Sequence, residues 1–197
     1  LNLFETKMFI DKSFYLNKGI FIGKNVTIKK NVKIYPNVFL DNCEIGKNVI
    51  IGPNSTIGFP GLVKFKKNGN NLKFPSIGKV LIKDKVKIGS NCVVARGTIE
   101  NTIIKENNIL GNDINVGHNV KIQKNCQISS GSKIGGGVII ERKSKISLGC
   151  KIKPNVNIGS ETFIGIGSVV VKNSKKKSKL FGVPAKQIKT LKNGISI

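Results

Sequence analysis

The sequence contains no tryptophan and only two tyrosines, so few of its side chains are suited to stacking on bases. Acidic residues are also scarce. Ten of them stand against 34 lysines and arginines, and the net charge of +24 would attract phosphates, nucleotides, acidic carrier proteins or nucleic acid. Only Arg96 and Arg142 are arginines, the residue on which proteins that recognise bases mostly rely. We therefore predict no nucleic-acid partner.

Long apolar runs are missing as well. No aliphatic stretch exceeds four residues, whereas a helix that crosses a bilayer needs about 20 apolar residues. No charged and then apolar leader opens the sequence, and we place no weight on the seven residues before Met8, the only methionine. We expect a cytoplasmic protein without integral membrane contact.

The four cysteines are widely spaced and include no C-x-x-C pair, which argues against both a zinc site and a disulfide framework. The single histidine, His118, cannot supply the three ligands of a zinc-dependent β-helical carbonic anhydrase. We predict reduced structural thiols and no metal.

The sequence does contain a repeat of six residues. From residue 104, every sixth residue is aliphatic: Ile104, Leu110, Val116, Ile122, Ile128, Ile134, Ile140, Ile146, Ile152, Ile158, Ile164 and Val170. The same register occurs earlier at Ile10, Leu16, Ile22, Ile28, Ile34 and Leu40, slips by one residue to Ile45, Ile51 and Ile57, and returns at Ile82, Ile88 and Val94. This period fits neither an α-helix nor a simple alternating strand, and it is typical of stacked coils. We predict an all-β fold, a left-handed parallel β-helix in which three hexapeptides form one triangular coil and each aliphatic points inward.

Two other repeat positions support this fold. The third residue after the aliphatic is a type that tolerates positive φ, as at Asn25, Asn31, Asn37, Asn48, Asn54, Asn91, Asn107, Asn119, Asn125, Gly131, Gly137, Gly149, Asn155 and Gly167. The fourth is commonly small or β-branched, as at Val26, Val32, Cys92, Val120, Cys126, Ser132, Val138, Cys150, Val156, Thr162 and Ser168. Three of the four cysteines thus occupy a position that calls for a small side chain.

The repeat is interrupted twice, by residues 58–79 and by a four-residue excess between Val94 and Ile104. Excursions from a solenoid are where function tends to lie. We divide the chain into an N-terminal extension (1–9), a β-helix domain (10–175, with the loop 58–79 inserted) and a C-terminal tail (176–197) that covers the open edge of the last coil.

His118 follows the inward Val116 by two residues and directly precedes a corner, so we expect it on the outer surface. Because coils repeat every 18 residues, the residue stacked above it is Gly136. Acyl transfer to an amine needs a general base and a donor for the oxyanion, and His118 with the Gly136 amide can supply both, with Asn119 able to orient the imidazole. A lone surface histidine is more often without a catalytic role, and an ordinary corner glycine explains Gly136 equally well. No serine or cysteine has a second histidine to activate it, which favours direct transfer over a covalent acyl-enzyme.

Four ordered blocks between Ile57 and Ile140 resemble the UDP-3-O-acylglucosamine N-acyltransferases of lipid A biosynthesis. They are Gly58-Phe59, Phe74-Pro75-Ser76-Ile77-Gly78-Lys79-Val80, Ala95-Arg96-Gly97-Thr98 and Gly117-His118-Asn119-Val120. The resemblance implies that His118 is the general base, Gly136 the oxyanion amide and 58–79 a substrate-contacting loop, in a homotrimer with sites between subunits. Ala95 departs from the family, which has aspartate there. We assign binding of the acceptor to Phe59, Phe74, Arg96, Asn112 and Asp113.

The end of the repeat, 164–172, together with Gly182-Val183-Pro184-Ala185-Lys186, resembles the close of acetyl-CoA-dependent sugar acetyltransferases. The resemblance implies that the final coils hold coenzyme A. The residues assigned to this role are Ser168, Lys175, Lys177, Pro184, Ala185 and Lys186.

The leading hypothesis is therefore an N-acyltransferase, in the first place an N-acetyltransferase using acetyl-CoA or another acyl-CoA. Its acceptor is the amino group of a nucleotide-linked amino sugar for surface polysaccharide or lipopolysaccharide. Three alternatives stay open: an N-acyltransferase of the lipid A type that takes its thioester from acyl carrier protein, a sugar O-acetyltransferase, and a non-catalytic trimeric β-helix scaffold.

Overall fold

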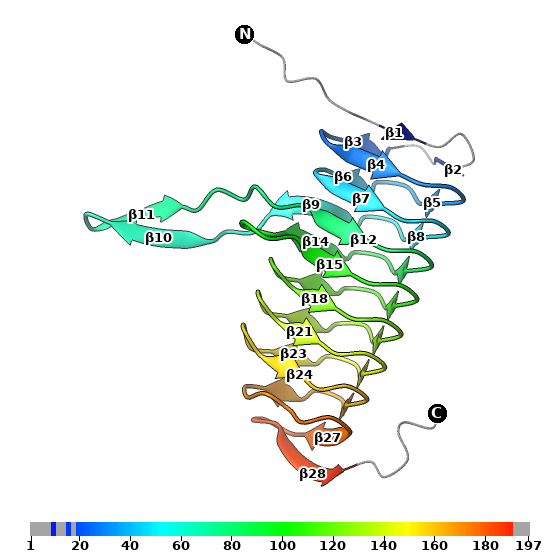
Figure 1. The fold of residues 1–197 in the computed structure, drawn as a ribbon. Coiled ribbons are helices and arrows are strands. Elements are labelled where there is room, and N and C mark those ends of the chain that lie inside the picture. The colour runs from blue at the N-terminus through cyan, green and yellow to red at the C-terminus, as the bar shows by residue number, and fades with distance from the viewer. Residues whose placement is uncertain (1–8, 11–14, 17–18, 191–197) are drawn as a thin grey trace.

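The computed structural model describes residues 9–10, 15–16 and 19–190. Most of the predicted N-terminal extension and the last seven residues of the predicted tail lie outside this part. The described chain is a left-handed parallel β-helix without α-helices, from which one hairpin projects (Figure 1). No helix of the described residues is long and apolar enough to span a membrane.

Three parallel sheets form the sides of the prism, and each coil adds one short strand to each sheet. Sheet A contains β1 (Phe9–Ile10), β4 (Val26–Ile28), β7 (Cys43–Ile45), β12 (Val80–Ile82), β15 (Thr102–Ile104), β18 (Lys121–Ile122), β21 (Ile139–Ile140) and β24 (Asn157–Ile158). Sheet B contains β2 (Tyr15–Leu16), β5 (Lys33–Ile34), β8 (Ile50–Ile51), β13 (Lys87–Ile88), β16 (Ile109–Leu110), β19 (Gln127–Ile128), β22 (Lys145–Ile146), β25 (Phe163–Ile164), β27 (Ser178–Phe181) and β28 (Lys186–Thr190). Sheet C contains β3 (Phe21–Ile22), β6 (Phe39–Leu40), β9 (Thr56–Pro60), β14 (Val93–Arg96), β17 (Asn115–Val116), β20 (Lys133–Ile134), β23 (Lys151–Ile152) and β26 (Val169–Val170).

The register of these sheets confirms the predicted repeat. Ile122 pairs with Ile104 on one side and with Ile140 on the other, at the expected 18-residue spacing. All twelve aliphatics predicted from residue 104 onward are buried in one continuous core, as are those of the slipped segment, Ile45, Ile51 and Ile57. Because each of these side chains packs on its counterpart in the next coil, no coil has a core by itself.

Backbone conformation at the corners also matches the prediction. Every asparagine and glycine predicted to adopt positive φ does so. Stacked corner asparagines bond to one another, as where Asn107 Nδ2 donates to Asn125 Oδ1 over 2.7 Å. The sequence pattern missed Lys85, Lys143 and Glu161, which adopt the same left-handed conformation without the side-chain chemistry that favours it. Each such corner costs about 1 kcal/mol relative to glycine, so the neighbouring coils impose the turn.

The interruptions also fall where the sequence places them. A shortened corner with φ of 45° at Asn42 absorbs the register slip. Strand β9 runs on to Pro60, and the chain then leaves the prism as an antiparallel hairpin of β10 (Lys64–Lys67) and β11 (Asn70–Lys73) before β12 resumes the coil (Figure 1). The four-residue excess forms an irregular turn after Arg96, between β14 and β15.

The end of the solenoid extends beyond residue 175. Strand β27 pairs in parallel with β25, and Leu180 is buried above Ile164 as a further rung. Strand β28 then pairs with β27 in the antiparallel sense, which continues the exposed edge of sheet B with a strand of opposite direction.

All four cysteines are buried and free, in keeping with the structural role predicted for them. The Cys92, Cys126 and Cys150 thiols each donate to a carbonyl of the next coil over 3.1 Å, and the serine hydroxyls of Ser132 and Ser144 make equivalent bonds in their coils. Burial raises the pKa of Cys43 to about 12 and that of Cys126 to about 11. These thiols therefore stay protonated in the folded chain at any physiological pH.

We expect the folded protein to resist thiol-specific disulfide reagents at pH 8, and the unfolded protein to react at all four cysteines. An unfolded thiol ionises near its ordinary pKa of 9.0, well below the folded value for Cys43. The stability that Cys43 contributes is therefore complete below pH 9 and is lost as pH rises from there toward 12. The unfolding free energy of the wild type, measured against Cys43→Ala, should fall between pH 9 and 11. Rapid modification of the native protein would contradict this assignment.

Candidate functional site

The candidate site lies at the corner where sheet C turns into sheet A. His118 follows β17 and precedes β18, and its side chain is half-buried, so the ring lies on the surface without being free in solvent. Asn119 is the left-handed corner residue, with φ of 60°. The histidine is therefore held by a rigid turn between two strands of the solenoid.

Hydrogen bonds around Asn119 determine the tautomer of the histidine. Asn119 Oδ1 accepts from the backbone N–H of Thr98 (3.2 Å) and from its hydroxyl (2.9 Å), and Nδ2 donates to the carbonyl of Glu100 (3.2 Å). A backbone donor and a backbone acceptor thus fix which end of the amide is oxygen. His118 Nδ1 lies 2.8 Å from that oxygen and must carry the proton, so Nε2 is left as a hydrogen-bond acceptor.

Gly136 lies directly against the imidazole, as the coil spacing predicts. A methyl group built at Gly136 would lie 2.5 Å from His118 Nε2. Positive φ in this turn occurs at Gly137 and not at Gly136, so backbone conformation does not require glycine at 136. Close approach of the histidine ring is the physical reason for the missing side chain.

The amide of Gly136 lacks the side-chain acceptor that some other coils supply. At the same repeat position, the Ser90 N–H donates to Asn112 Oδ1 and the Asn112 N–H donates to Ser130 Oγ, each over 2.9 Å. The next coil presents Pro154 above Gly136, and proline has no side-chain acceptor. The Gly136 N–H accordingly makes no hydrogen bond with any described residue, which leaves it available to an oxygen of a bound molecule.

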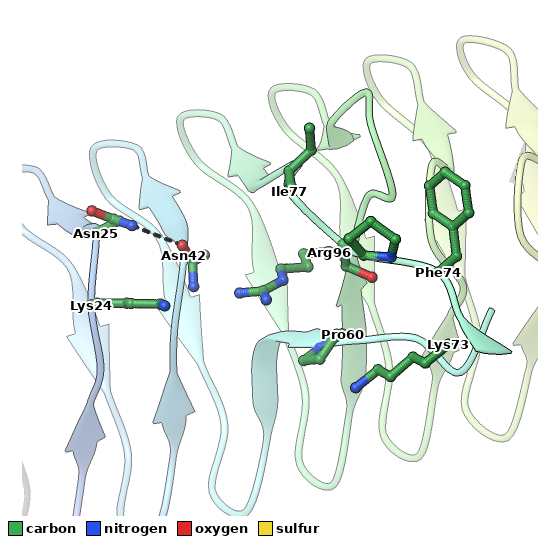
Figure 2. A pocket seen from close by; sticks show the side chains of 10 residues that line it. Lys24, Asn25, Asn42, Pro60, Lys73, Phe74, Ile77 and Arg96 are labelled. Carbon is green, nitrogen blue, oxygen red and sulfur yellow. Dashed lines mark hydrogen bonds between the residues drawn. The ribbon is translucent and has the colours of Figure 1, made fainter. Parts of the chain in front are cut away.

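The excursion brings further residues to this corner. Gly61 lies over the histidine, where a built Cβ would be 3.5 Å from His118 Cδ2. The returning strand of the hairpin and the preceding coils enclose a cavity of about 540 Å³, lined among others by Pro60, Phe74 and Arg96 (Figure 2). The structure thus places Phe74 and Arg96, both predicted to bind the acceptor, in one cavity beside the catalytic candidates.

Electrostatic contacts around the corner are local. Arg96 Nη1 forms an ion pair of 3.1 Å with Asp41 Oδ2, and both side chains are only 16% exposed. On the other side of Asn119, Lys121 donates to Glu100 over 2.7 Å, and this hydrogen bond lowers the pKa of Glu100. The described residues contain no cluster of three potential metal ligands.

Other predicted site residues lie elsewhere. Phe59 is 54% exposed and packs edge-on against Phe39 on the outside of sheet C. Asn112 and Asp113 lie on a different corner, between sheets B and C, where Asp113 pairs with Lys133 over 2.9 Å. Within one chain, these residues are not brought together with His118.

Most residues assigned to coenzyme A are in the last coil. Lys175, Pro184 and Lys186 are exposed, Lys177 is half-buried at a left-handed corner, and Ala185 packs partly on the core. Ser168 is fully buried, and its hydroxyl accepts a hydrogen bond from the Gly182 N–H over 3.2 Å. Its side chain therefore packs the last coil and has no surface to offer to a ligand.

Sequence reasoning missed several residues of the site. Thr98 holds Asn119 although it lies in the turn after Arg96, and Thr102 is a buried acceptor for the Asn119 N–H at 2.9 Å. Thr98 could have been identified from the sequence, because it belongs to the Ala95-Arg96-Gly97-Thr98 block. Nothing in the sequence distinguished Lys24 and Lys73 from the many other lysines. Only the folded structure brings the two side chains to one cavity.

Comparisons with known proteins agree with the fold and with the motif resemblance. The family described as bacterial transferase hexapeptide (six repeats) matches residues 19–58. UDP-3-O-acylglucosamine N-acyltransferases of Fusobacterium nucleatum and Agrobacterium fabrum are 42% and 39% identical over 83 and 87 residues. These segments are 42% and 44% of this chain but only 25% and 24% of the relatives, so the match spans about a quarter of their length.

A solved structure extends the likeness of fold to nearly the whole chain. The UDP-N-acetylglucosamine acyltransferase LpxA of Bacteroides fragilis superposes with a TM-score of 0.72 at 23% identity, over 92% of this chain and 74% of its own. The resemblance inferred from the motifs is confirmed by the sequence relatives, and the β-helix by the structural neighbour.

We expect Asn119→Gly to release the histidine without disturbing the corner, because glycine adopts positive φ readily and removes only the amide. The chain has one histidine, so its imidazole nitrogens give one resolved set of NMR signals. The wild type should show the Nδ1–H tautomer and Asn119→Gly a mixture. The matched control is Asn125→Gly, at another corner with φ of 60°, which should leave the signals unchanged. A wild-type Nε2–H tautomer would refute the assignment.

Proposed function

We propose that this chain is an N-acyltransferase that moves an acyl group from a thioester to the amino group of a nucleotide-linked amino sugar. The observation that carries the proposal is the pairing of His118 Nε2 with a bare backbone N–H at Gly136. Nε2 is an acceptor because Nδ1 keeps the proton and donates it in a hydrogen bond to Asn119 Oδ1. A base and an oxyanion donor on adjacent coils are what acyl transfer requires. The names of the sequence relatives support the reaction class.

In the proposed reaction the amine attacks the thioester carbonyl while His118 Nε2 takes its proton. The Gly136 N–H donates a hydrogen bond to the negative oxygen of the tetrahedral intermediate. When the carbon–sulfur bond breaks, the thiolate leaves and the proton passes from His118 to the sulfur. The products are an amide and a free thiol, and the histidine returns to its starting state. Asn119 acts as a positioning residue that holds the required tautomer.

For the donor we propose acetyl-CoA or another acyl-CoA, with acyl carrier protein as the alternative. Exposed lysines of the last coil, Lys175 and Lys186, support coenzyme A, because lysines bind phosphates as mobile point charges. We also propose a homotrimer. The separation of Asn112 and Asp113 from His118 in one chain supports this state, because those residues would reach a His118 site only from a neighbouring subunit.

The first prediction concerns turnover. Purified protein should release free thiol from acetyl-CoA in the presence of a UDP- or dTDP-linked amino sugar, and His118→Ala should lower the rate by about 10²- to 10⁴-fold. Thiol release only from a hydroxyacyl carrier protein would show that the donor is acyl carrier protein and not coenzyme A. Full activity of a folded His118→Ala, or no turnover with either donor, would overturn the proposal and favour a scaffold.

The second prediction concerns Gly136→Ala. Its methyl group would overlap the space of His118 Nε2, so the ring must move away from the amide. We expect kcat/KM to fall by about 100-fold, comparable to the loss of one oxyanion donor, with little change in melting temperature. Ser160→Ala is the control, because Ser160 follows the inward Ile158 as Gly136 follows Ile134 and lies far from the histidine. Equal effects of the two substitutions would argue against this role for Gly136.

A further inference from the structure

The cavity beside the histidine corner has walls from three separate parts of the chain. Lys24 and Asn25 come from the corner after β3, and Asn42 comes from the corner one coil later. Lys73 ends the hairpin, and Arg96 ends β14. Figure 2 shows the side chains of Lys24, Lys73 and Arg96 extending into the same space from different walls. Three cations thus converge although no two of them are neighbours in sequence.

The polar groups of this cavity are not satisfied within the chain. Arg96 Nε and Ser76 Oγ are buried atoms without a hydrogen-bond partner. Lys24 and Lys73 form no ion pair with any described residue, although Lys24 donates its backbone N–H to Asp41 Oδ1 over 3.0 Å. Asp41 is the carboxylate that contacts the cavity lining, and it is shared between Arg96 and the Asn42 amide. Three cations against one carboxylate leave an excess of positive charge.

The position of the cavity relates it to the reacting groups. Pro60 lines it, and Gly61, the next residue, contacts the ring of His118. The cavity extends from the histidine toward the N-terminal coils. The lysines expected to meet coenzyme A lie in the opposite direction, three coils beyond His118, which is about 14 Å at about 4.8 Å per coil.

From these observations we infer that the cavity is the subsite for the diphosphate of the acceptor, held by Lys24, Lys73 and Arg96. The inference rests on the proposed function, and it adds the location of the nucleotide end of the acceptor. A diphosphate carries multiple negative charges and several acceptor oxygens, which suits a planar guanidinium and two mobile ammonium groups. Coenzyme A also contains a diphosphate. The lysines assigned to coenzyme A lie beyond His118 in the other direction, so we assign this cavity to the acceptor. The test below distinguishes the two ligands.

The test measures binding by calorimetry without any acyl donor, at constant ionic strength, with UDP, dTDP, uridine and coenzyme A as probes. UDP or dTDP should bind to the wild type, and uridine, which lacks phosphate, should bind far more weakly. Lys24→Ala and Lys73→Ala should each weaken nucleotide binding by roughly five- to tenfold. Arg96 is left intact, because its ion pair with Asp41 is mostly buried and its loss could unfold the coil.

The matched control is Lys67→Ala. Lys67 lies on the same hairpin as Lys73 and pairs with Asn70, so it points to the opposite face from Lys73, which pairs with Lys64. It removes the same charge, and nucleotide affinity should stay within twofold of the wild type. An equal loss of nucleotide affinity in Lys67→Ala would show that the effect comes from the overall charge of the protein, and it would reject the subsite.

Other outcomes are equally decisive. Failure of the wild type to bind either nucleotide would reject the subsite, and weakened coenzyme A binding with unchanged nucleotide binding would assign the cavity to the donor. Thiol release with an unchanged KM for the nucleotide sugar in Lys24→Ala and Lys73→Ala would reject the subsite while the transferase remains. Selective nucleotide binding in a protein without turnover would preserve the subsite and reject the reaction.

Discussion

Parallel stacking of coils at a spacing of 18 residues is the constraint on which the rest of this structure depends. Each inward isoleucine, leucine or valine is buried only because the coils before and after it supply the facing side chains. The backbone hydrogen bonds join the same neighbouring coils, as where the Gly137 N–H donates to the His118 carbonyl over 2.8 Å. A residue's neighbours along the axis are therefore determined by the repeat, and the candidate site uses this property directly.

The site is built from ordinary repeat positions with small departures. Asn119 occupies the left-handed corner like many other asparagines, but its side chain bonds to His118 and Thr98 instead of to another corner asparagine. Gly136 stands where other coils have a side chain, and Pro154 above it supplies no acceptor for its N–H. The turn after Arg96 supplies the carbonyl and hydroxyl groups that orient the corner. The proposed base and oxyanion donor need no change to the solenoid, because a rigid stack already holds these groups at fixed spacing.

Charge is distributed around the site in a way that composition does not reveal. The net charge of +24 describes a protein covered with lysine, most of it solvated. In the cavity, two lysines and one arginine face a common space in which polar atoms lack partners. Concentrated charge in a partly enclosed site attracts an anion more strongly than the same charge spread over an open surface. The segment that returns from the hairpin, residues 73–77, matters for the same reason, since it lines one side of that space.

The fold and the candidate corner of His118 and Gly136 could be derived from the sequence because both depend on local periodicity. A six-residue period is enough to assign the inward aliphatics, the asparagine corners and the stacking of Gly136 on His118. The tertiary structure decided what depends on excursions from the period. It brought Lys24, Lys73 and Arg96 into one cavity, placed Asn112 and Asp113 on another corner, and buried Ser168 in the last coil. A repeat determines its own register, whereas the path of an inserted hairpin depends on side-chain contacts across distant coils, and a single sequence carries no period that encodes them.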